Sequence, residues 1–323
     1  MPKAIQLTET GDAENLTVIE QAIPAPGPGE VQIRNHAIGI NFIDIYIRRG
    51  LYAADLPIIL GKEAAGEVIA IGQGVTSHTV GDRVAALVDD GGYAEVTNAQ
   101  ADRTAILPGG VSYEDAAAIL LKGLTAAMLL RDVYPLKSGD KAIITAAAGG
   151  VGGILCQWAR IIGGEVIAIV GSAEKLEIAS ANKADHIIIR EQTNDLTAAI
   201  RDITDGDGAD VAYDSLGADT FISILDALRP RATMVTYGNA TGPVPPIAPL
   251  ELAKRGSLTL IRPTLFDYAT PERFTKMAAD LFTAVTDGGL RPKIHKQYQL
   301  DDAAKAHQFL ESGQSQGAVI LRP

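Results

Sequence analysis

Short runs in which hydrophobic and polar residues alternate fill the first third of the chain. Residues 31–40, VQIRNHAIGI, alternate as a strand with one buried face does, and strand-like runs also cover 63–72 and 82–88. Glycine and proline interrupt these runs at close intervals, and no helical stretch of note precedes Ser112. Short strands at this spacing predict a compact, partly open β-barrel domain.

From Ser112 onward, helical patterns alternate with strands. Ser112 and Asp115 have the spacing of an N-terminal capping box, and a long helix rich in Ala and Leu follows them. Beyond residue 140, continuously apolar strands alternate with helices, which is typical of right-handed βαβ units and a parallel sheet covered on both faces. The predicted strands read KAIITA, EVIAIV, HIII, DVAYDS, TMVTYG and GSLTLI. This part of the chain is therefore predicted to be a Rossmann-type domain.

The pattern breaks again after about residue 265, where two helices and two short strands are predicted. This tail is too short to fold alone, so we expect it to pack on the first domain. We therefore predict an α/β protein of two domains. One is a partly open β-barrel domain from 1–123 and 265–323, and the other is an inserted cofactor domain from 124–264.

The sharpest motif is the glycine-rich segment 146–153, AAAGGVGG, which directly follows the strand KAIITA and directly precedes an amphipathic helix. Glycines permit a tight turn and let backbone amides approach a pyrophosphate, which the helix N-terminus stabilises electrostatically. Because strand, turn, helix and following strand are all in register, the segment predicts a dinucleotide site.

The end of the second strand of this domain distinguishes two nicotinamide cofactors. A site for NAD usually places Asp or Glu there, bonded to the ribose 2′-hydroxyl. Here Ser172 and Lys175 follow the strand, with no carboxylate at its end, and Arg190 follows the third strand near the same rim. A hydroxyl and an ammonium bind a 2′-phosphate, which a carboxylate would repel. The alternative is that Lys175 and Arg190 are solvated surface charges; the pattern favours NADPH over NADH.

Charge and cysteine content narrow the class of protein. The net charge is −11 with scattered Lys and Arg, so a nucleic-acid partner is not expected. There is no apolar run long enough for a membrane helix and no signal-peptide pattern at the start. The single cysteine, Cys156, falls in a helical apolar pattern and is expected to be a buried structural thiol. A reducing, cytoplasmic location fits these features.

Metal-ligand patterns are absent from the sequence. Zinc needs three or four Cys, His, Asp or Glu side chains that converge on one point. One cysteine excludes a four-cysteine site, and the five histidines show no paired spacing: His36, His78, His186, His295 and His307. We therefore expect hydride transfer without a Lewis-acid metal, which suits a quinone or an activated alkene better than an alcohol.

Eight short segments that run in order over nearly the whole chain carry a family resemblance. They are GINFIDIYIR (39–48), GLY (50–52), GKEAAG (61–66), VGDRV (80–84), LKGLT (121–125), AAAGGVG (146–152), YDSLG (213–217) and YGN (237–239). With them the chain resembles the zinc-independent medium-chain dehydrogenases/reductases, specifically quinone oxidoreductases of the zeta-crystallin type. The resemblance implies that the barrel domain is GroES-like. Zinc-containing relatives carry a cysteine near the position of Asn41 and a histidine at that of Lys62.

The resemblance also implies a set of site residues. The residues near the nicotinamide and the substrate pocket would be Asn41, Ile43, Asp44, Tyr46 and Tyr52. Among them Asn41, Tyr46 and Tyr52 are the catalytic candidates; the alternative is that the tyrosines only wall the pocket. The other cofactor contacts would be Thr125, Gly149, Gly150, Val151, Gly171, Ser172, Lys175, Arg190, Ser215, Tyr237, Gly238, Asn239, Ala240, Arg262, Thr264 and Leu265.

Several positions depart from the family pattern. Relatives often have a tyrosine where this chain has Arg190, and an arginine where it has Gly313. Aromatic residues often found after the LKGLT motif are replaced by alanines and a methionine at 126–128. The usual glycine before the third strand falls near Asn182 and Lys183, and we expect Asn182 to take the left-handed conformation in its place.

Three functions are open at this point. The first is reduction of a quinone by NADPH in a cleft between the domains, with the hydroxyls of Tyr46 and Tyr52 bonding a quinone oxygen and Asn41 orienting the nicotinamide amide. The second is reduction of an activated carbon–carbon double bond in an enal, enone or enoyl thioester. The third is a cofactor-binding structural, crystallin-like or RNA-associated role. The GSLTLI strand would lie at a sheet edge, so a homodimer is expected.

Overall fold

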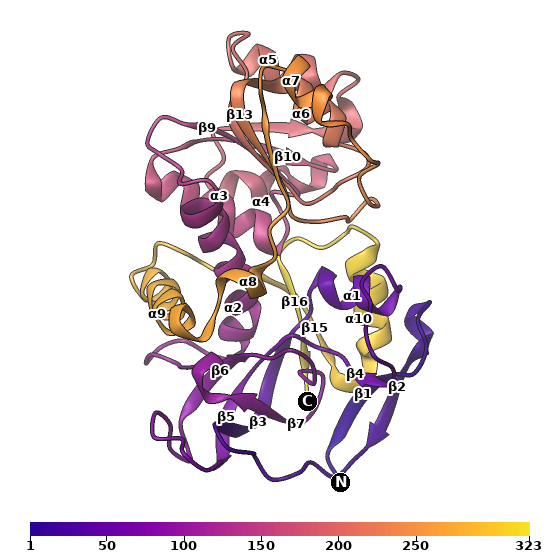
Figure 1. The fold of residues 1–323 in the computed structure, drawn as a ribbon, viewed down its shortest axis with the longest axis vertical. Coiled ribbons are helices and arrows are strands. Elements are labelled where there is room, and N and C mark those ends of the chain that lie inside the picture. Colours follow the sequence, from indigo (N-terminus) through magenta and orange to yellow (C-terminus); the bar gives the residue numbers. More distant parts are fainter. The chain divides into compact units, whose positions relative to one another are not determined.

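The computed structural model describes all residues, Met1–Pro323, and divides them into two compact units (Figure 1). The first unit contains Met1–Leu124 and Ala269–Pro323, and the second contains Thr125–Tyr268. In Figure 1 the first unit is therefore drawn in the colours of both ends of the chain, and the second in the colours of its middle. The second unit is an insertion in the first.

The first unit is mostly β-structure. Its strands are β1 (Lys3–Leu7), β2 (Leu16–Glu20), β3 (Glu30–Gly39), β4 (Ile58–Ile59), β5 (Glu63–Ile71), β6 (Arg83–Leu87), β7 (Val96–Gln100), β8 (Thr104–Ile106), β15 (Ile294–Gln299) and β16 (Ala318–Arg322). Its helices are α1 (Phe42–Arg48), α9 (Pro271–Thr286), α10 (Ala303–Glu311), most of α2 (Tyr113–Met128), and the short 3-10 helices η1 (Ala13–Asn15), η2 (Ala101–Arg103) and η6 (Leu300–Asp302).

One sheet of the first unit has the order β15-β16-β3-β5-β6-β8, with β7 also paired to β3, and a smaller sheet has the order β2-β1-β4. Along β3 the predicted alternation is present: Val31 and Ile33 are buried, whereas Arg34 and His36 are exposed. The C-terminal strand β16 pairs antiparallel with β3, so the tail returns to the first unit as expected. The predicted GroES-like fold is confirmed.

Helix α1 corrects the expectation that no helix precedes Ser112. Its sequence, FIDIYIR, is rich in β-branched residues and reads as a strand because such residues have low helix propensity. The helix begins where the Asp44 carboxylate accepts a hydrogen bond from the Asn41 backbone N–H at 2.9 Å. This local cap and the burial of Ile45 and Ile47 fix the helix despite its composition. Ser112 and Asp115 do form the predicted cap at the start of α2.

The second unit alternates strands and helices. Its strands are β9 (Lys141–Thr145), β10 (Glu165–Val170), β11 (His186–Ile189), β12 (Ala209–Asp214), β13 (Leu228–Thr236) and β14 (Thr259–Ile261). Its helices are α3 (Gly150–Ile162), α4 (Leu176–Ala181), α5 (Leu196–Ile203), α6 (Phe221–Ala227), α7 (Pro249–Lys254), α8 (Leu265–Tyr268), the π-helical turn η3 (Leu129–Val133) and the 3-10 helices η4 (Ala173–Lys175) and η5 (Arg190–Gln192).

The six strands of the second unit form one parallel sheet in the order β11-β10-β9-β12-β13-β14. The chain moves outward from β9 first in one direction and then, from β12, in the other. Right-handed crossovers therefore place α3 and α4 on one face and α6 on the opposite face. Ligands of such sheets bind at the carboxyl ends of the strands where the order reverses, which here is between β9 and β12. The predicted Rossmann fold is confirmed.

Candidate functional site

The phosphate loop connects β9 to α3 in the second unit. Ala146 has a positive φ of 48°, and its carbonyl accepts a hydrogen bond from the Gly149 N–H at 2.8 Å. A Cβ on Gly152 would lie 2.3 Å from the same carbonyl oxygen, so only glycine permits this close turn. Gly149 precedes α3 and has no side chain to cap it, so the N–H groups of Gly150 and Val151 have no partner within the helix. An uncapped helix start of this kind binds anionic phosphate.

The turn after β10 lies beside this loop, because β9 and β10 are paired neighbours. Gly171 and Ser172 follow the strand, and Lys175 ends the short helix η4 and is half-buried. The pKa of Lys175 is lowered, mainly by burial and partly by the Arg190 guanidinium, whereas Glu191 opposes the shift. The interpretation of Lys175 as a freely solvated charge is therefore not favoured. Its ammonium is a half-buried cation at the strand end where NAD sites carry a carboxylate.

Arg190 begins η5 after β11 and lies close enough to Lys175 to influence its charge. Its Nη1 donates to Asp219 Oδ2 at 2.9 Å, so part of its charge is already paired. Sequence reasoning missed Asp219, which comes after the YDSLG motif and has no spacing that would mark it.

The ends of β12 and β13 bring together the predicted residues 215 and 237–240. The backbone N–H of Ala240 donates to the Ser215 carbonyl at 3.1 Å. Gly238 packs so closely on Ser215 that a Cβ would lie 2.4 Å from its carbonyl oxygen. Arg262, after β14, donates from Nη1 to the Gly238 carbonyl at 2.9 Å. The segment that contains Tyr237 thus lies beside Ser215. Ser215 directly follows β12, one of the two strands between which the strand order reverses.

The remaining predicted cofactor residues lie in or directly before helices. Thr125 is buried in α2, Leu265 is buried at the start of α8, and Thr264 is exposed directly before it. The roles of these three residues in cofactor binding stay predictions.

Asn182 does not take the left-handed conformation that we expected. Its φ and ψ are −77° and 8°, and the next residue, Lys183, has a φ of 70° instead. The physical reason is that the Asn182 side chain is buried and bonded. Its Nδ2 donates to the Ala147 carbonyl at 3.1 Å, and its Oδ1 accepts from Gln157 Nε2 at 3.0 Å. Asn182 therefore holds the phosphate loop through the Ala147 carbonyl, a role that no sequence motif indicates.

In the first unit, Asn41 belongs to a buried polar cluster. Its Nδ2 donates to Glu63 Oε1 at 2.8 Å, and Lys122 Nζ donates to the same oxygen at 3.1 Å. Glu63 and Lys122 were not among the predicted site residues, although the GKEAAG and LKGLT motifs contain them. Lys62, by contrast, faces a loop, where it donates to Asp90 Oδ1 at 2.7 Å.

Tyr46 lies in α1, and Tyr52 lies in the turn that follows this helix. The rings of Tyr46 and Tyr52 lie 5.4 Å apart in an edge-to-face arrangement, and the Tyr52 N–H donates to the Tyr46 carbonyl at 3.2 Å. Tyr46 is buried, whereas Tyr52 lies at the surface. Ile43, on the same helix, is half-buried.

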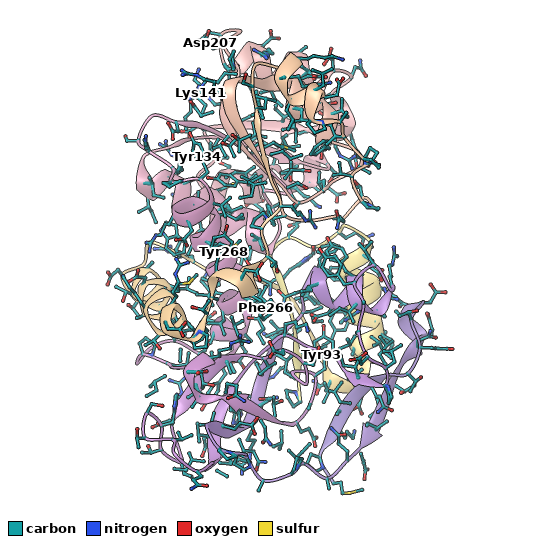
Figure 2. All side chains as sticks on the ribbon, viewed as in Figure 1. Tyr93, Tyr134, Lys141, Asp207, Phe266 and Tyr268 are labelled. Carbon is teal, nitrogen blue, oxygen red and sulfur yellow. The ribbon has the colours of Figure 1, made fainter.

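The side chain of Asp44 is fully buried, with 0% of its surface exposed. Besides the Asn41 N–H, its carboxylate accepts from the Tyr93 hydroxyl at 2.9 Å, and that hydroxyl also bonds His307 Nε2 at 3.0 Å. Tyr93 is labelled in Figure 2. Burial raises the pKa of Asp44 to about 7 and lowers that of His307 to about 3, so His307 is neutral. The Asp44 side chain is therefore an internal support for α1, and its role as a cofactor contact stays a prediction.

No group of three or more His, Cys, Asp or Glu side chains in the chain is arranged to hold a metal ion. No helix is long and apolar enough to cross a membrane. Cys156 is buried in α3, and burial raises the pKa of its thiol, as expected for a structural cysteine.

These features define the class of protein. The family model of the alcohol dehydrogenase GroES-like domain matches residues 27–117, and the model described as zinc-binding dehydrogenase matches residues 150–283. A GroES-like unit with an inserted dinucleotide-type unit is the architecture of the medium-chain dehydrogenases/reductases.

Curated relatives narrow the class further. The chain is 42% identical over 326 residues to a quinone oxidoreductase of Pseudomonas aeruginosa, with 100% of both chains covered. It is 39% identical over 332 residues to a 2-haloacrylate reductase of Burkholderia sp, with 100% and 99% covered. The structure of Escherichia coli quinone oxidoreductase complexed with NADPH superimposes with a TM-score of 0.96 at 41% identity, with 99% and 100% covered. The chain belongs to the zeta-crystallin-type quinone oxidoreductase family.

Proposed function

We propose that this protein is an NADPH:quinone oxidoreductase. The observation that carries the proposal is the pair of anion sites at adjacent strand ends of the second unit. One is the uncapped start of α3, and the other is the turn with Ser172 and Lys175. A pyrophosphate and a 2′-phosphate need two such sites next to one another. The quinone oxidoreductases at 42% identity over the full chain, and a relative solved with NADPH, support the choice.

The residues fit this cofactor. The amides of Gly150 and Val151 would bind the pyrophosphate, and the Ser172 hydroxyl and Lys175 ammonium would bind the 2′-phosphate, with Arg190 beside them. When bound, NADPH supplies the reducing equivalents for the acceptor. The protein's contribution is then positioning and charge complementarity.

We assign acceptor binding to the first unit. The hydroxyl of Tyr52, at the surface beside Tyr46, can donate to an acceptor oxygen and support its protonation. Lys62 holds the position at which zinc-containing relatives have a histidine, and an ammonium bonded to Asp90 cannot act as a metal ligand. We therefore expect chelators to leave the rate of quinone reduction unchanged.

A second candidate is a reductase of activated carbon–carbon double bonds. The observation that favours it is the 39% identity to a 2-haloacrylate reductase over the whole chain. The same cofactor site would serve, and a tyrosine hydroxyl would supply a proton to the α-carbon.

A panel of acceptors separates the candidates. Steady-state oxidation of NADPH would be measured with benzoquinones, with enones and with 2-haloacrylate. The proposal expects benzoquinones to give the highest kcat/KM. Reduction of an enone or of 2-haloacrylate at least about tenfold faster would replace it by the second candidate. Tight NADPH binding without turnover of any acceptor would favour the crystallin-like role.

We also propose a homodimer. Strand β14 (Thr259–Ile261) pairs only with β13 and lies at one edge of the parallel sheet. An edge strand offers unpaired N–H and C=O groups to a second copy. Light scattering at micromolar concentration should give twice the chain mass of 33.9 kDa, and a monomer mass would reject the dimer.

A further inference from the structure

Arg190 lies beside the turn that follows β10. Strands β10 and β11 are parallel neighbours, so the residues after them meet at the same edge of the sheet. The Glu191 N–H donates to the Gly171 carbonyl at 3.2 Å, which ties the start of η5 to this turn. The pKa of Lys175 is lowered mainly by burial and also by the Arg190 guanidinium. Two cations, Lys175 and Arg190, therefore belong to this part of the second unit.

The guanidinium of Arg190 is only partly used. Its Nη1 donates to Asp219 Oδ2 at 2.9 Å, whereas its Nε is buried and has no hydrogen-bond partner. An arginine binds an anion most strongly through two parallel N–H bonds, and a buried donor without a partner costs free energy. The side chains of Arg190 and Asp219 are also 36% and 49% exposed, so water screens their attraction. The pair is thus weak, and Arg190 can exchange it for another anion.

Asp219 is the fixed partner of this pair. It lies between β12 and α6, and its N–H donates to Thr241 Oγ1 at 3.2 Å. The N–H of the preceding residue, Ala218, donates to the Gly242 carbonyl at 3.1 Å. These bonds to the segment after β13 hold the backbone that carries the carboxylate, and none of them involves Arg190. The long arginine side chain is therefore the partner that can move.

A 2′-phosphate and the Asp219 carboxylate would compete for the same guanidinium. A phosphate carries more negative charge than a carboxylate and has three acceptor oxygens, so it can bind two N–H groups of Arg190 at once. Asp219 would then be left to water, which its exposure permits at low cost. Because the pair must open first, part of the binding free energy of the phosphate is spent on breaking it.

We propose that Asp219 is a specificity-determining residue, which holds Arg190 in the free protein, releases it to a 2′-phosphate and so lowers the preference for NADPH over NADH. NADH has no 2′-phosphate, so its binding does not require the pair to open. Asp219 acts on the cofactor only through Arg190. The inference rests on the proposed use of NADPH.

The test compares 2′,5′-ADP with 5′-AMP, two nucleotides that differ only in the 2′-phosphate. The variant is Asp219→Asn in the full chain, which removes the carboxylate at an exposed position and keeps the size of the side chain. Calorimetry gives the Kd of both nucleotides. We expect the Kd of 2′,5′-ADP to fall about threefold, the size of one exposed ion pair, and that of 5′-AMP to change less than about 1.5-fold.

Two controls separate this exchange from a general effect of charge. Asp226 of α6 is exposed and pairs with Arg255 Nε at 2.6 Å, so Asp226→Asn removes the same charge from the same unit and should change neither Kd. In an Arg190→Ala background, Asp219→Asn should no longer lower the Kd of 2′,5′-ADP. A direct repulsion between Asp219 and the phosphate would persist in that background.

Three results would overturn the inference. They are an unchanged or higher Kd of 2′,5′-ADP in Asp219→Asn, an equal fall for 5′-AMP, and the same fall in the Arg190→Ala background. A higher Kd would mean that Asp219 positions Arg190 for the phosphate instead of withholding it. A wild type that binds 2′,5′-ADP no more tightly than 5′-AMP would end the proposed use of NADPH and this inference with it. A wild type that prefers 2′,5′-ADP, with no effect of Asp219→Asn, would end this inference alone.

Discussion

Replacing Lys175 by alanine removes the one half-buried cation at the end of β10. We expect this side chain to contribute most of the binding free energy for a 2′-phosphate. The neighbouring Arg190 already shares its charge with Asp219 at 2.9 Å, whereas burial lowers the pKa of Lys175 and a phosphate partner would reverse that shift. A hydrogen bond between charged groups contributes about 1.5–3 kcal/mol, so the loss corresponds to a rise of roughly 10- to 150-fold in the KM for NADPH.

The assay is steady-state quinone reduction with NADPH and with NADH, for wild type and Lys175→Ala. NADH has no 2′-phosphate, so its KM should change less than about twofold. Arg190→Ala should have a smaller effect than Lys175→Ala because Asp219 already pairs with it. Lys254→Ala is the matched control, since Lys254 is an exposed lysine of the same unit and pairs only with Glu251. An equal change of KM with both cofactors, or no change, would contradict a contact between Lys175 and the 2′-phosphate.

Three further predictions concern the supports of the site. Asn182→Ala removes the bond to the Ala147 carbonyl, so the KM for NADPH should rise about tenfold with kcat unchanged; a fall in kcat alone would contradict this. Gly152→Ala places a Cβ 2.3 Å from the Ala146 carbonyl oxygen, so calorimetry should detect no NADPH binding. NADPH binding with wild-type affinity would contradict the close turn, because it would show that the loop accommodates the added Cβ. Burial raises the pKa of Asp44 to about 7, so its contribution to stability is complete below about pH 4 and is lost as pH rises through about 7. Urea denaturation of Asp44→Asn should thus show a stability deficit that narrows from pH 5 to pH 8, and a deficit independent of pH would contradict the assignment.

Local patterns were enough to predict the architecture. The apolar strands of the second unit and the AAAGGVGG turn are each determined by residues that lie close together in the sequence. The parallel sheet was predicted because these strands alternate with helices. Helix α1 was missed because its β-branched composition competes with a cap formed by Asn41 and Asp44.

The internal supports of the site could not be predicted, because they depend on contacts between distant segments. Nothing in the spacing of residues 41, 63 and 122 shows that one carboxylate joins them, and nothing near Asn182 shows that it holds Ala147. The bond between Tyr93 and Asp44 also joins distant segments. The motif around Asp44 predicts a contact with the cofactor, and only the structure shows that its side chain is buried and faces inward.

We conclude that the chain transfers reducing equivalents from NADPH to a quinone. The most direct measurement is the kcat/KM of the wild-type protein for NADPH and for NADH at saturating 1,4-benzoquinone, followed by the loss of reduced-nicotinamide absorbance. We expect quinone-dependent oxidation with a preference for NADPH of at least about tenfold, the effect of a single bound phosphate contact. Equal use of NADH, or no oxidation when the quinone is added, would contradict it.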